Sequence, residues 1–283
     1  MGSNPAAPTI FPITRDERTR DCVKDPSADD RMKTDLSGAP QSGLTHSGER
    51  PVVSAILFDK DGTLLDFQRT WGPSAQQVMR HLANGDDAAY ERLAAVTGFV
   101  DSEQRFLPDS ILIREPTHVY GVLWAAALGR NANSELFAEI DRLFLKATTE
   151  NLAPIGDPKT LLANLAMRGY RLGMITNDAE IPARAHSRKL GIEQHLEFIA
   201  GYNSGYGAKP APEPVLAFAR HVGVKPSEVA VIGDTVHDLA AARAAGAIAI
   251  GVLTGPAVAA SLAPHADALF PSATEFAAWL DKR

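Results

Sequence analysis

The chain has 283 residues, of which 45% are hydrophobic, and its formal net charge is -6 at pH 7. That length suits one large domain or one domain with a sizeable insertion, and the apolar content is ample for a buried core. The 28 basic residues are spread along the chain, so we expect neither nucleic acid nor a membrane surface as a partner. The apolar runs are far shorter than the roughly 20 residues that span a bilayer, and no transmembrane segment is predicted.

Residues 1–50 mix Pro, Gly, Ser and Thr with charges of both signs, and Phe11 is their only aromatic residue. Because this composition offers little apolar surface to bury, we predict a disordered N-terminal extension, with a functional docking arm as the alternative. The beginning of the chain shows no signal-peptide pattern, and Cys22 is the only cysteine. We therefore expect a cytoplasmic location.

From Val52 onward, short runs rich in Ile, Val and Leu alternate with amphipathic segments. The runs show little alternation of apolar and polar residues, which is typical of strands buried on both faces. This order predicts a doubly wound α/β fold with a parallel sheet. Within residues 266–280 a short strand precedes a helix that Ser272 can cap. The other predicted strands are 53–59, 170–178, 196–202, 228–234 and 247–255, and the other predicted helices are 158–168, 181–190, 212–221 and 237–245.

The segment from Phe67 to Ala153 breaks this alternation, because helical patterns follow one another there without a convincing strand. We predict an all-helical cap at 67–153, inserted into an α/β core that comprises residues 51–66 and 154–283. Trp124, Leu123 and Phe144 occupy apolar helix positions and are expected to pack inside the cap. The predicted cap helices are 73–83, 87–96, 117–128 and 134–149.

Polar residues follow the apolar runs where the predicted strands end, and a lysine precedes one of these strands in a proline-rich loop. Because the carboxyl ends of parallel strands meet at one edge of a sheet, we expect these residues to surround a ligand. If the chain stays extended after the first strand, the first two aspartates project to the same side. The residues are Asp59 and Asp61, Thr176, Asn177 and Asp178, Lys209, and Asp234 and Asp238.

The chemistry of this set indicates phosphate and a divalent cation. Mg²⁺ favours oxygen ligands, with one or two carboxylates completed by water and a substrate phosphate. Thr176, Lys209 and backbone N–H groups can bind the phosphate oxygens. Asp59 is the expected nucleophile, because a carboxylate can attack phosphorus and form an aspartyl-phosphate. Asp61 can protonate the leaving oxygen and later activate water.

Other interpretations of these residues fail on spacing. An EF-hand loop that begins at Asp59 needs Gly at position 64 and Glu at position 70, where the sequence has Leu64 and Thr70. The chain contains no GxxxxGK[ST], HExxH or GxSxG motif, and GYGAKP at Gly205 lacks the third glycine of a dinucleotide fingerprint. An isolated Asp-Gly pair can be a simple turn. Here, however, the Asp-Gly pair is the first of four polar motifs that occur in order, each at the end of a strand or in a loop.

This ordered combination resembles the haloacid dehalogenase-like hydrolase superfamily, from about Val52 onward. The helical insertion is similar to the cap of its phosphoglycolate phosphatase-like subgroup. The matching residues are Asp59, Asp61, Gly62 and Thr63 in the first motif, Thr176 in the second, Lys209 in the third, and Asp234 and Asp238 within GDTVHD in the fourth.

The resemblance implies a Mg²⁺ site made by Asp59, Asp234 and the backbone carbonyl of Asp61, with Asp238 in support. It also implies a phosphatase rather than a dehalogenase, because dehalogenases lack the acid at position 61. Thr176, Asn177, Lys209 and Gly62 are the expected phosphate-binding residues.

Several other residues near these motifs are also candidates for a role. Arg69 and Trp71, at the beginning of the cap, are possible substrate-specificity residues, with packing at a hinge as the alternative. Asp178 adds a negative charge where a small neutral residue was expected, and the sequence identifies no partner for it. His237 is expected to be solvated at the start of a helix, and His186 has no visible partner.

The sequence thus predicts a Mg²⁺-dependent phosphatase of small phosphorylated metabolites, of the phosphoglycolate or sugar-phosphate type. One alternative is a sugar phosphomutase or phosphotransferase with the same nucleophile, in which a second hydroxyl replaces water as the acceptor. Another is a non-catalytic binding protein on the same scaffold. The sequence does not define the leaving group, because cap side chains determine it, and it does not define the oligomeric state.

Overall fold

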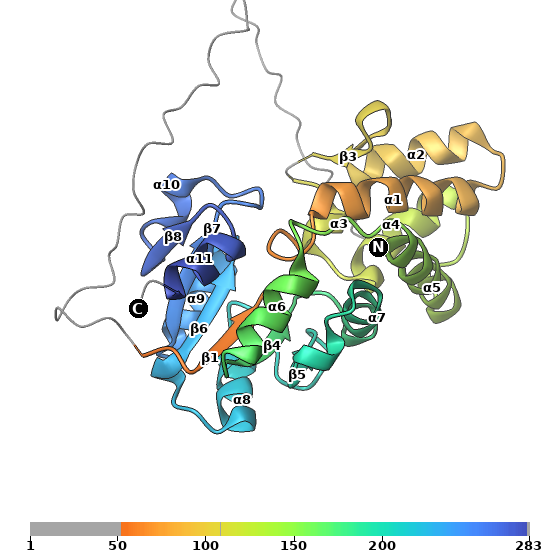
Figure 1. The fold of residues 1–283 in the computed structure, drawn as a ribbon. Helices are drawn as coiled ribbons and strands as arrows, with labels where there is room; N and C mark the ends of the chain where they lie inside the picture. Colours follow the sequence, from red (N-terminus) through yellow and green to blue (C-terminus); the bar gives the residue numbers. More distant parts are fainter. Residues whose placement is uncertain (1–51, 108, 282–283) are drawn as a thin grey trace, which may run out of the picture. The chain divides into compact units, whose positions relative to one another are not determined.

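The computed structural model describes residues 52–107 and 109–281, so the predicted extension at 1–50 lies outside the described residues. The strands of the main sheet are β1 (Ala55–Phe58), β4 (Arg171–Ile175), β5 (Phe198–Ala200), β6 (Val229–Gly233), β7 (Ile248–Val252) and β8 (Ala268–Phe270). They form one six-stranded sheet in the order β5-β4-β1-β6-β7-β8, and β1 lies between β4 and β6 (Figure 1). All neighbouring pairs of strands are parallel, as the sequence predicts.

The register of the central strands places their carboxyl ends at one edge of the sheet. Phe58, the last residue of β1, is level with Met174 of β4 and Ile232 of β6. Every residue of β1, β6 and β7 is buried, because helices cover both faces of the sheet. The predicted doubly wound α/β fold is therefore confirmed.

Two apolar clusters separate the sheet from its helices. On one face, residues of α6, α7 and α11 pack with side chains such as Ile56 and Phe58, and on the other, residues of α8 and α9 pack with Ala55 and Leu57. The predicted cap of the last helix is confirmed, because Ser272 Oγ accepts a hydrogen bond from the Thr274 N–H at 3.1 Å. The helices are α6 (Pro158–Met167), α7 (Glu180–Leu190), α8 (Glu213–Val222), α9 (Val236–Ala244), the short α10 (Ala259–Leu262) and α11 (Ala273–Leu280).

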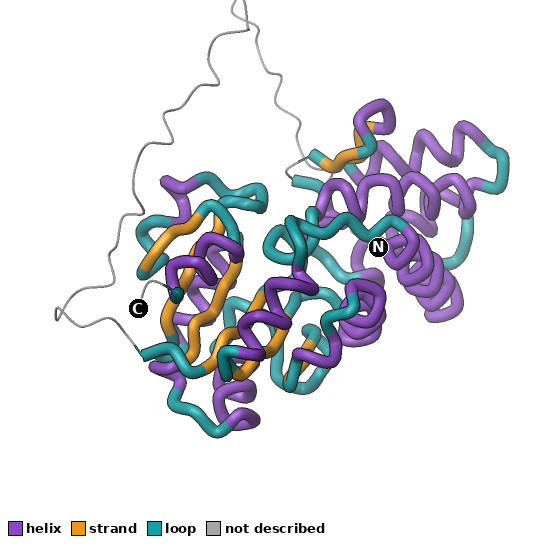
Figure 2. The backbone as a smooth tube through the Cα atoms, viewed as in Figure 1, coloured by secondary structure: helices purple, strands orange, loops and turns teal. Residues whose placement is uncertain are grey.

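The segment between β1 and β4 is predominantly helical, as Figure 2 shows. Its helices bury a third apolar cluster, which includes Trp124 and Phe144. Leu123 is 40% exposed, so the prediction that it packs inside this cluster is wrong. The adjacent Trp124 takes the inward position on the same helix. The helices are α1 (Phe67–Ala83), α2 (Asp87–Thr97), α3 (Ile111–Arg114), α4 (Thr117–Leu128) and α5 (Ser134–Glu150).

Two features of this segment differ from the sequence prediction. Helix α1 begins at Phe67 rather than at Pro73, because Asp66 Oδ1 accepts from the Arg69 N–H at 3.0 Å and caps the helix six residues earlier. The segment also contains a two-stranded antiparallel pair, β2 (Phe99–Val100) and β3 (Arg105–Phe106), so it is not entirely helical. Strands of two residues are too short for a periodic pattern to reveal.

None of the helices in the described part of the chain is long and apolar enough to cross a membrane.

Candidate active site

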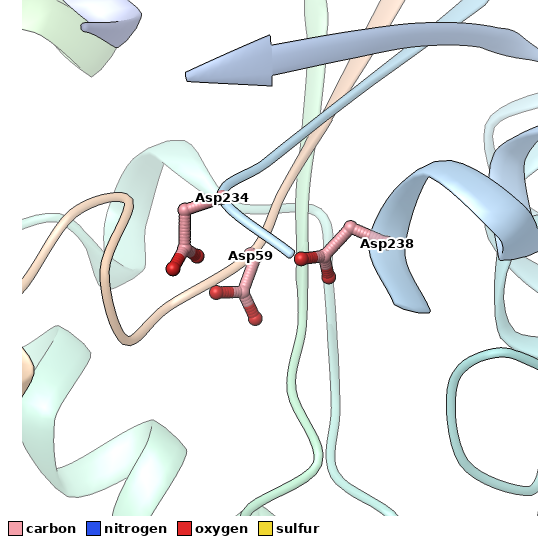
Figure 3. Close-up of side chains that lie close together, drawn as sticks. All are labelled: Asp59, Asp234 and Asp238. Carbon is pink, nitrogen blue, oxygen red and sulfur yellow. The ribbon is translucent and has the colours of Figure 1, made fainter. Parts of the chain in front are cut away.

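Three aspartates converge beyond the carboxyl ends of β1 and β6. The Asp59 N–H donates to the Ile232 carbonyl at 2.8 Å, so strand pairing continues one residue past β1 and holds the Asp59 backbone. Asp234 directly follows β6, and Asp238 lies in the first turn of α9. Figure 3 shows Asp59 between the other two, and one carboxylate oxygen from each residue lies within 4.8 Å of the others. All three side chains are buried.

Two glycines leave the space that the Asp234 carboxylate occupies. Gly62 has φ of +83°, and a Cβ at this position would lie 2.2 Å from Asp234 Oδ2. A Cβ at Gly255 would lie 1.7 Å from the same oxygen. The Gly62 N–H, a predicted phosphate donor, instead donates to the Leu65 carbonyl at 2.6 Å. In this structure Gly62 therefore makes room for the carboxylate and does not offer its N–H to the site.

Lys209 joins two of these aspartates. Its Nζ contacts Asp59 Oδ1, and it lies 2.5 Å from Asp238 Oδ1. The other Asp238 oxygen accepts from the Thr235 N–H at 3.0 Å and the Thr235 hydroxyl at 2.6 Å, a capping box that orients the carboxylate. Both Asp238 oxygens thus have donors, which suits a supporting role better than direct coordination of a cation.

Asn177 holds the loop that carries Lys209. Its Nδ2 donates to the Lys209 carbonyl at 3.0 Å, and its Oδ1 accepts from the Lys209 N–H at 2.9 Å. These two bonds hold the Asn177 side chain against the Lys209 backbone and leave its second Nδ2 proton for the predicted phosphate contact. These two hydrogen bonds help to hold Lys209 near Asp59, although the two residues are far apart in the sequence.

Thr176 lies at the end of β4 and is 5% exposed. Its N–H donates to the Ala200 carbonyl at 3.0 Å, which extends the β4–β5 pairing, and its hydroxyl oxygen accepts from the Asp178 N–H at 3.0 Å. A hydroxyl that accepts one bond retains its own proton as a donor. Thr176 is therefore equipped to donate to a phosphate oxygen.

Burial and crowding make full ionisation of the three aspartates unfavourable. Burial raises the pKa of Asp59 to about 7, against the opposing charge of Lys209. Burial and the charges of Asp59 and Asp238 raise the pKa of Asp234 to about 9. Three carboxylates face one ammonium, and the donors are all hard oxygen atoms. These residues fit a divalent cation of the Mg²⁺ type, which would offset the excess negative charge.

Asp61 does not join this cluster. The chain turns after Asp59, and the N–H groups of Leu64 and Leu65 both donate to the Lys60 carbonyl, at 2.9 and 3.0 Å. The chain is therefore not extended through Asp61, which was the condition for Asp59 and Asp61 to project to the same side. Asp61 Oδ2 lies 2.8 Å from Lys60 Nζ, and Asp61 Oδ1 accepts from the Trp71 indole N–H at 3.0 Å. Although burial opposes ionisation, Lys60 and the bond from Trp71 hold the pKa of Asp61 below its ordinary value.

Lys60 is the main site residue that sequence reasoning missed. The side chain is 1% exposed, and its Nζ lies 2.9 Å from Asp178 Oδ2 and 3.3 Å from His186 Nδ1. Lys60 is thus the cation that Asp178 lacked in the sequence. Burial and the positive charge of Lys60 lower the pKa of His186 to about 3, so the imidazole is neutral. A lysine directly after a buried strand was the available signal, since a buried ammonium requires carboxylate partners.

The two predicted specificity residues have different surroundings. The Trp71 ring packs against Phe67 and Phe144, with centroid distances of 6.0 and 5.7 Å, and its N–H points to Asp61. Arg69 is exposed, and no hydrogen bond or ion pair of its guanidinium is found with the described residues. His237 is exposed, in agreement with the solvated position expected for it.

Comparison with known proteins agrees with this fold. Residues 53–246 match the family model of the haloacid dehalogenase-like hydrolases. A phosphoglycolate phosphatase from Chromobacterium violaceum is 32% identical over 225 residues, which is 74% of this chain and 89% of that protein. The chain therefore belongs to the haloacid dehalogenase-like hydrolase family.

Two further proteins are similar to this chain. A phosphoglycolate phosphatase from Neisseria meningitidis is 28% identical over 72% of this chain and 81% of its own length. A Thermotoga maritima structure, provisionally described as a beta-phosphoglucomutase, superposes with a TM-score of 0.60 at 20% identity over 81% of this chain and 99% of its own. The latter likeness shows the fold alone. By sequence the chain is a phosphatase of the phosphoglycolate phosphatase-like type.

Proposed function

We propose that this chain is a Mg²⁺-dependent phosphatase of small phosphorylated metabolites, of the phosphoglycolate or sugar-phosphate type, that acts through an aspartyl-phosphate on Asp59. The observation that carries the proposal is the buried cluster of Asp59, Asp234 and Asp238 with Lys209 at the carboxyl edge of the sheet. Four charged side chains from three parts of the chain are held there at the cost of desolvation. Such an arrangement is more typical of a reaction site than of a structural ion pair.

Asp59 is the proposed nucleophile, since its backbone is held by strand pairing and its side chain contacts Lys209. Attack by one carboxylate oxygen on phosphorus forms the Asp59–phosphorus bond, while the bond between phosphorus and the leaving oxygen breaks. Lys209 and the Thr176 hydroxyl would hold the other phosphate oxygens. Asp59, Asp234 and the Asp61 carbonyl would hold Mg²⁺, which when bound neutralises charge on the phosphoryl group.

Asp61 is the proposed acid and base. It would protonate the leaving oxygen in the first half of the reaction and accept a proton from water in the second. It follows the nucleophile by two positions in the sequence, and its carboxylate has its own donors, Lys60 and Trp71. This separation keeps the residue that transfers protons out of the cluster that binds metal.

Recognition of the leaving group is proposed for the cap at 67–153, over a core of residues 51–66 and 154–283. The cap helices bury their own apolar cluster, which supports movement as a unit over the site. The names of the curated relatives support phosphoglycolate as one substrate to test. A substrate carboxylate needs a cation, and Lys60 already faces two aspartates, so Arg69 remains the proposed partner.

A screen of phosphorylated metabolites tests the proposal. Purified full-length protein is incubated with phosphoglycolate and a set of sugar phosphates, with Mg²⁺ or with a chelator, and released phosphate is measured. We expect release only with Mg²⁺. If no substrate is turned over, a non-catalytic protein is the better interpretation. If the phosphoryl group is transferred to a second hydroxyl rather than released as inorganic phosphate, the protein is a phosphotransferase.

A further inference from the structure

Lys60 and its partners form a second network beside the candidate active site, in which Lys60 and His186 are buried and Asp61 and Asp178 are partly exposed. We propose that Lys60 is a positioning residue that, together with Trp71, orients Asp61 for the activation of water in hydrolysis of the phosphoenzyme. Asp178 and His186 in turn orient Lys60. This inference rests on the proposed function, because it assigns a role within the second half of that reaction.

The donors and acceptors of this network match one to one. An ammonium has three protons and no acceptor, and the Lys60 Nζ has three acceptors, at 2.8 Å in Asp61, 2.9 Å in Asp178 and 3.3 Å in His186. The position and direction of the ammonium are thus determined on all sides. No proton of Lys60 is left to bind a substrate in this arrangement.

Both oxygens of Asp61 accept hydrogen bonds from groups that can only donate. Oδ2 faces the Lys60 ammonium, and Oδ1 accepts from the Trp71 indole N–H at 3.0 Å. Two donors from different elements fix the plane of the carboxylate. An oriented carboxylate that has retained both oxygens as acceptors is suited to take a proton from water.

His186 extends the network into the cap. Its Nε2 lies 2.9 Å from the Thr148 hydroxyl, and that hydroxyl donates to the Phe144 carbonyl at 2.7 Å. Because the Thr148 proton is thereby used, His186 Nε2 carries the hydrogen and donates it, and His186 Nδ1 is left as the acceptor for Lys60. The neutral tautomer thus follows from the hydrogen bonds. Trp71 on α1 and Thr148 on α5 connect the network to two cap helices.

The proposed step balances without any further reactant. The oxygen of water forms a bond to phosphorus as the bond between phosphorus and the Asp59 oxygen breaks, and its electron pair returns to the Asp59 carboxylate. One water proton passes to the Asp61 carboxylate, and inorganic phosphate leaves. Lys60 touches neither the water nor the phosphoryl group, so it acts only through Asp61.

A kinetic test uses p-nitrophenyl phosphate, whose leaving group departs with little need for an acid. For Lys60→Met we expect kcat to fall about 100-fold, because a proton-transfer group such as Asp61 typically contributes at least this factor when it is correctly positioned. kcat/KM should change less than about threefold. kcat/KM reports phosphorylation of Asp59, whereas kcat includes hydrolysis of the phosphoenzyme. The variant should therefore release one equivalent of p-nitrophenol in a burst, and acid quenching should trap the aspartyl-phosphate.

Trp71→Phe provides a second variant that removes one donor but retains the ring. We again expect kcat to fall while kcat/KM changes little. The fall in kcat should be about tenfold, which is smaller than for Lys60→Met because only one hydrogen bond is lost. Lys189→Met, a change of an exposed lysine on α7, is the matched control and should behave as wild type. Asp59→Asn should give no burst at all.

The outcomes separate this inference from the proposed function. If kcat and kcat/KM fall equally in Lys60→Met and Trp71→Phe, and no phosphoenzyme accumulates, the positioning role is wrong. A wild-type protein that does not hydrolyse p-nitrophenyl phosphate with Mg²⁺ would instead contradict the phosphatase proposal itself. Where Lys60→Met does not fold, Trp71→Phe alone decides between the two results.

Discussion

Two buried lysines lie beside the carboxyl edge of the sheet, and each faces two aspartates. Lys209 contacts Asp59 and Asp238, and Lys60 contacts Asp61 and Asp178. The first group includes one more carboxylate, that of Asp234. Taken as fully ionised, three carboxylates and one ammonium leave two negative charges in the Lys209 cluster. Two carboxylates and one ammonium leave one negative charge in the Lys60 network.

This difference appears in the pKa values of the aspartates. In the Lys209 cluster, burial raises the pKa of Asp59 to about 7 and that of Asp234 to about 9. In the Lys60 network, despite burial, the ammonium and the Trp71 donor lower the pKa of Asp61, whereas burial raises that of Asp178. The first cluster therefore lacks positive charge, which a metal ion can supply. In the Lys60 network the charges are closer to balance without a metal ion, which suits the positioning of a side chain.

The largest expected effect concerns the nucleophile. Asp59→Asn should abolish turnover and leave the fold intact, because the amide is nearly isosteric with the carboxylate but cannot attack phosphorus. Phosphate release measures the activity and circular dichroism the fold. Substantial residual hydrolysis would mean that water attacks the substrate directly and that no aspartyl-phosphate forms.

Removal of each lysine should distinguish the two networks. Lys60→Met leaves Asp61 and Asp178, which are 18% and 17% exposed, without their cation, and we expect a loss of about 1–3 kcal/mol in the free energy of unfolding, measured with urea. The double variant Lys60→Met/Asp178→Asn should lose less, since one uncompensated charge is gone. Mg²⁺ should restore part of the stability that Lys209→Met loses, but it should not restore the stability that Lys60→Met loses. Equal restoration of both variants by Mg²⁺ would remove the distinction.

The stability of the metal-free protein should fall as pH rises. The pKa values of Asp59 and Asp234 in the folded protein, about 7 and about 9, lie above the ordinary value of 3.8. Between pH 4 and 9 the folded state then binds more protons than the unfolded chain, so stability present at low pH is lost across this window. We expect the Tm in chelator to drop by several degrees, and Mg²⁺ to raise it most at the alkaline end.

Asp234→Asn is the control for this pH effect. It removes the carboxylate with the higher pKa and should flatten the metal-free profile above pH 7 while it weakens the response to Mg²⁺. A metal-free Tm that rises steadily from pH 5 to 9 would show that the crowded aspartates do not govern stability there.

The smallest expected effect lies in the cap. Arg69→Ala should raise KM for the best metabolite about tenfold, equivalent to ~1.4 kcal/mol of binding, if its exposed guanidinium binds a second anionic group. Turnover of p-nitrophenyl phosphate, which has no such group, should change far less. Equal losses on both substrates would assign Arg69 to the structure of the cap instead.

Local sequence patterns were sufficient for the order of elements and for the placement of the cluster. Apolar runs predict the six strands, and Asp59 and Asp234 directly follow two of them. In a parallel sheet such residues meet at one edge whatever the details of the loops, because topology brings strand ends together. The cap at Ser272 was also predictable from the sequence, because a helix cap depends on residues that are close in sequence.

Tertiary structure decided the direction of Asp61 and the partners of Lys60. Asp61 and Asp178 lie in loops 117 positions apart, and His186 lies on α7, so no periodic pattern in the sequence joins them to one ammonium. A turn whose backbone bonds converge on the Lys60 carbonyl separates Asp61 from Asp59, although period two places them on one side. The sequence determined which charges the protein carries beside its sheet, and long-range packing determined which of them neutralise one another, because pairing of buried charges depends on distance in space.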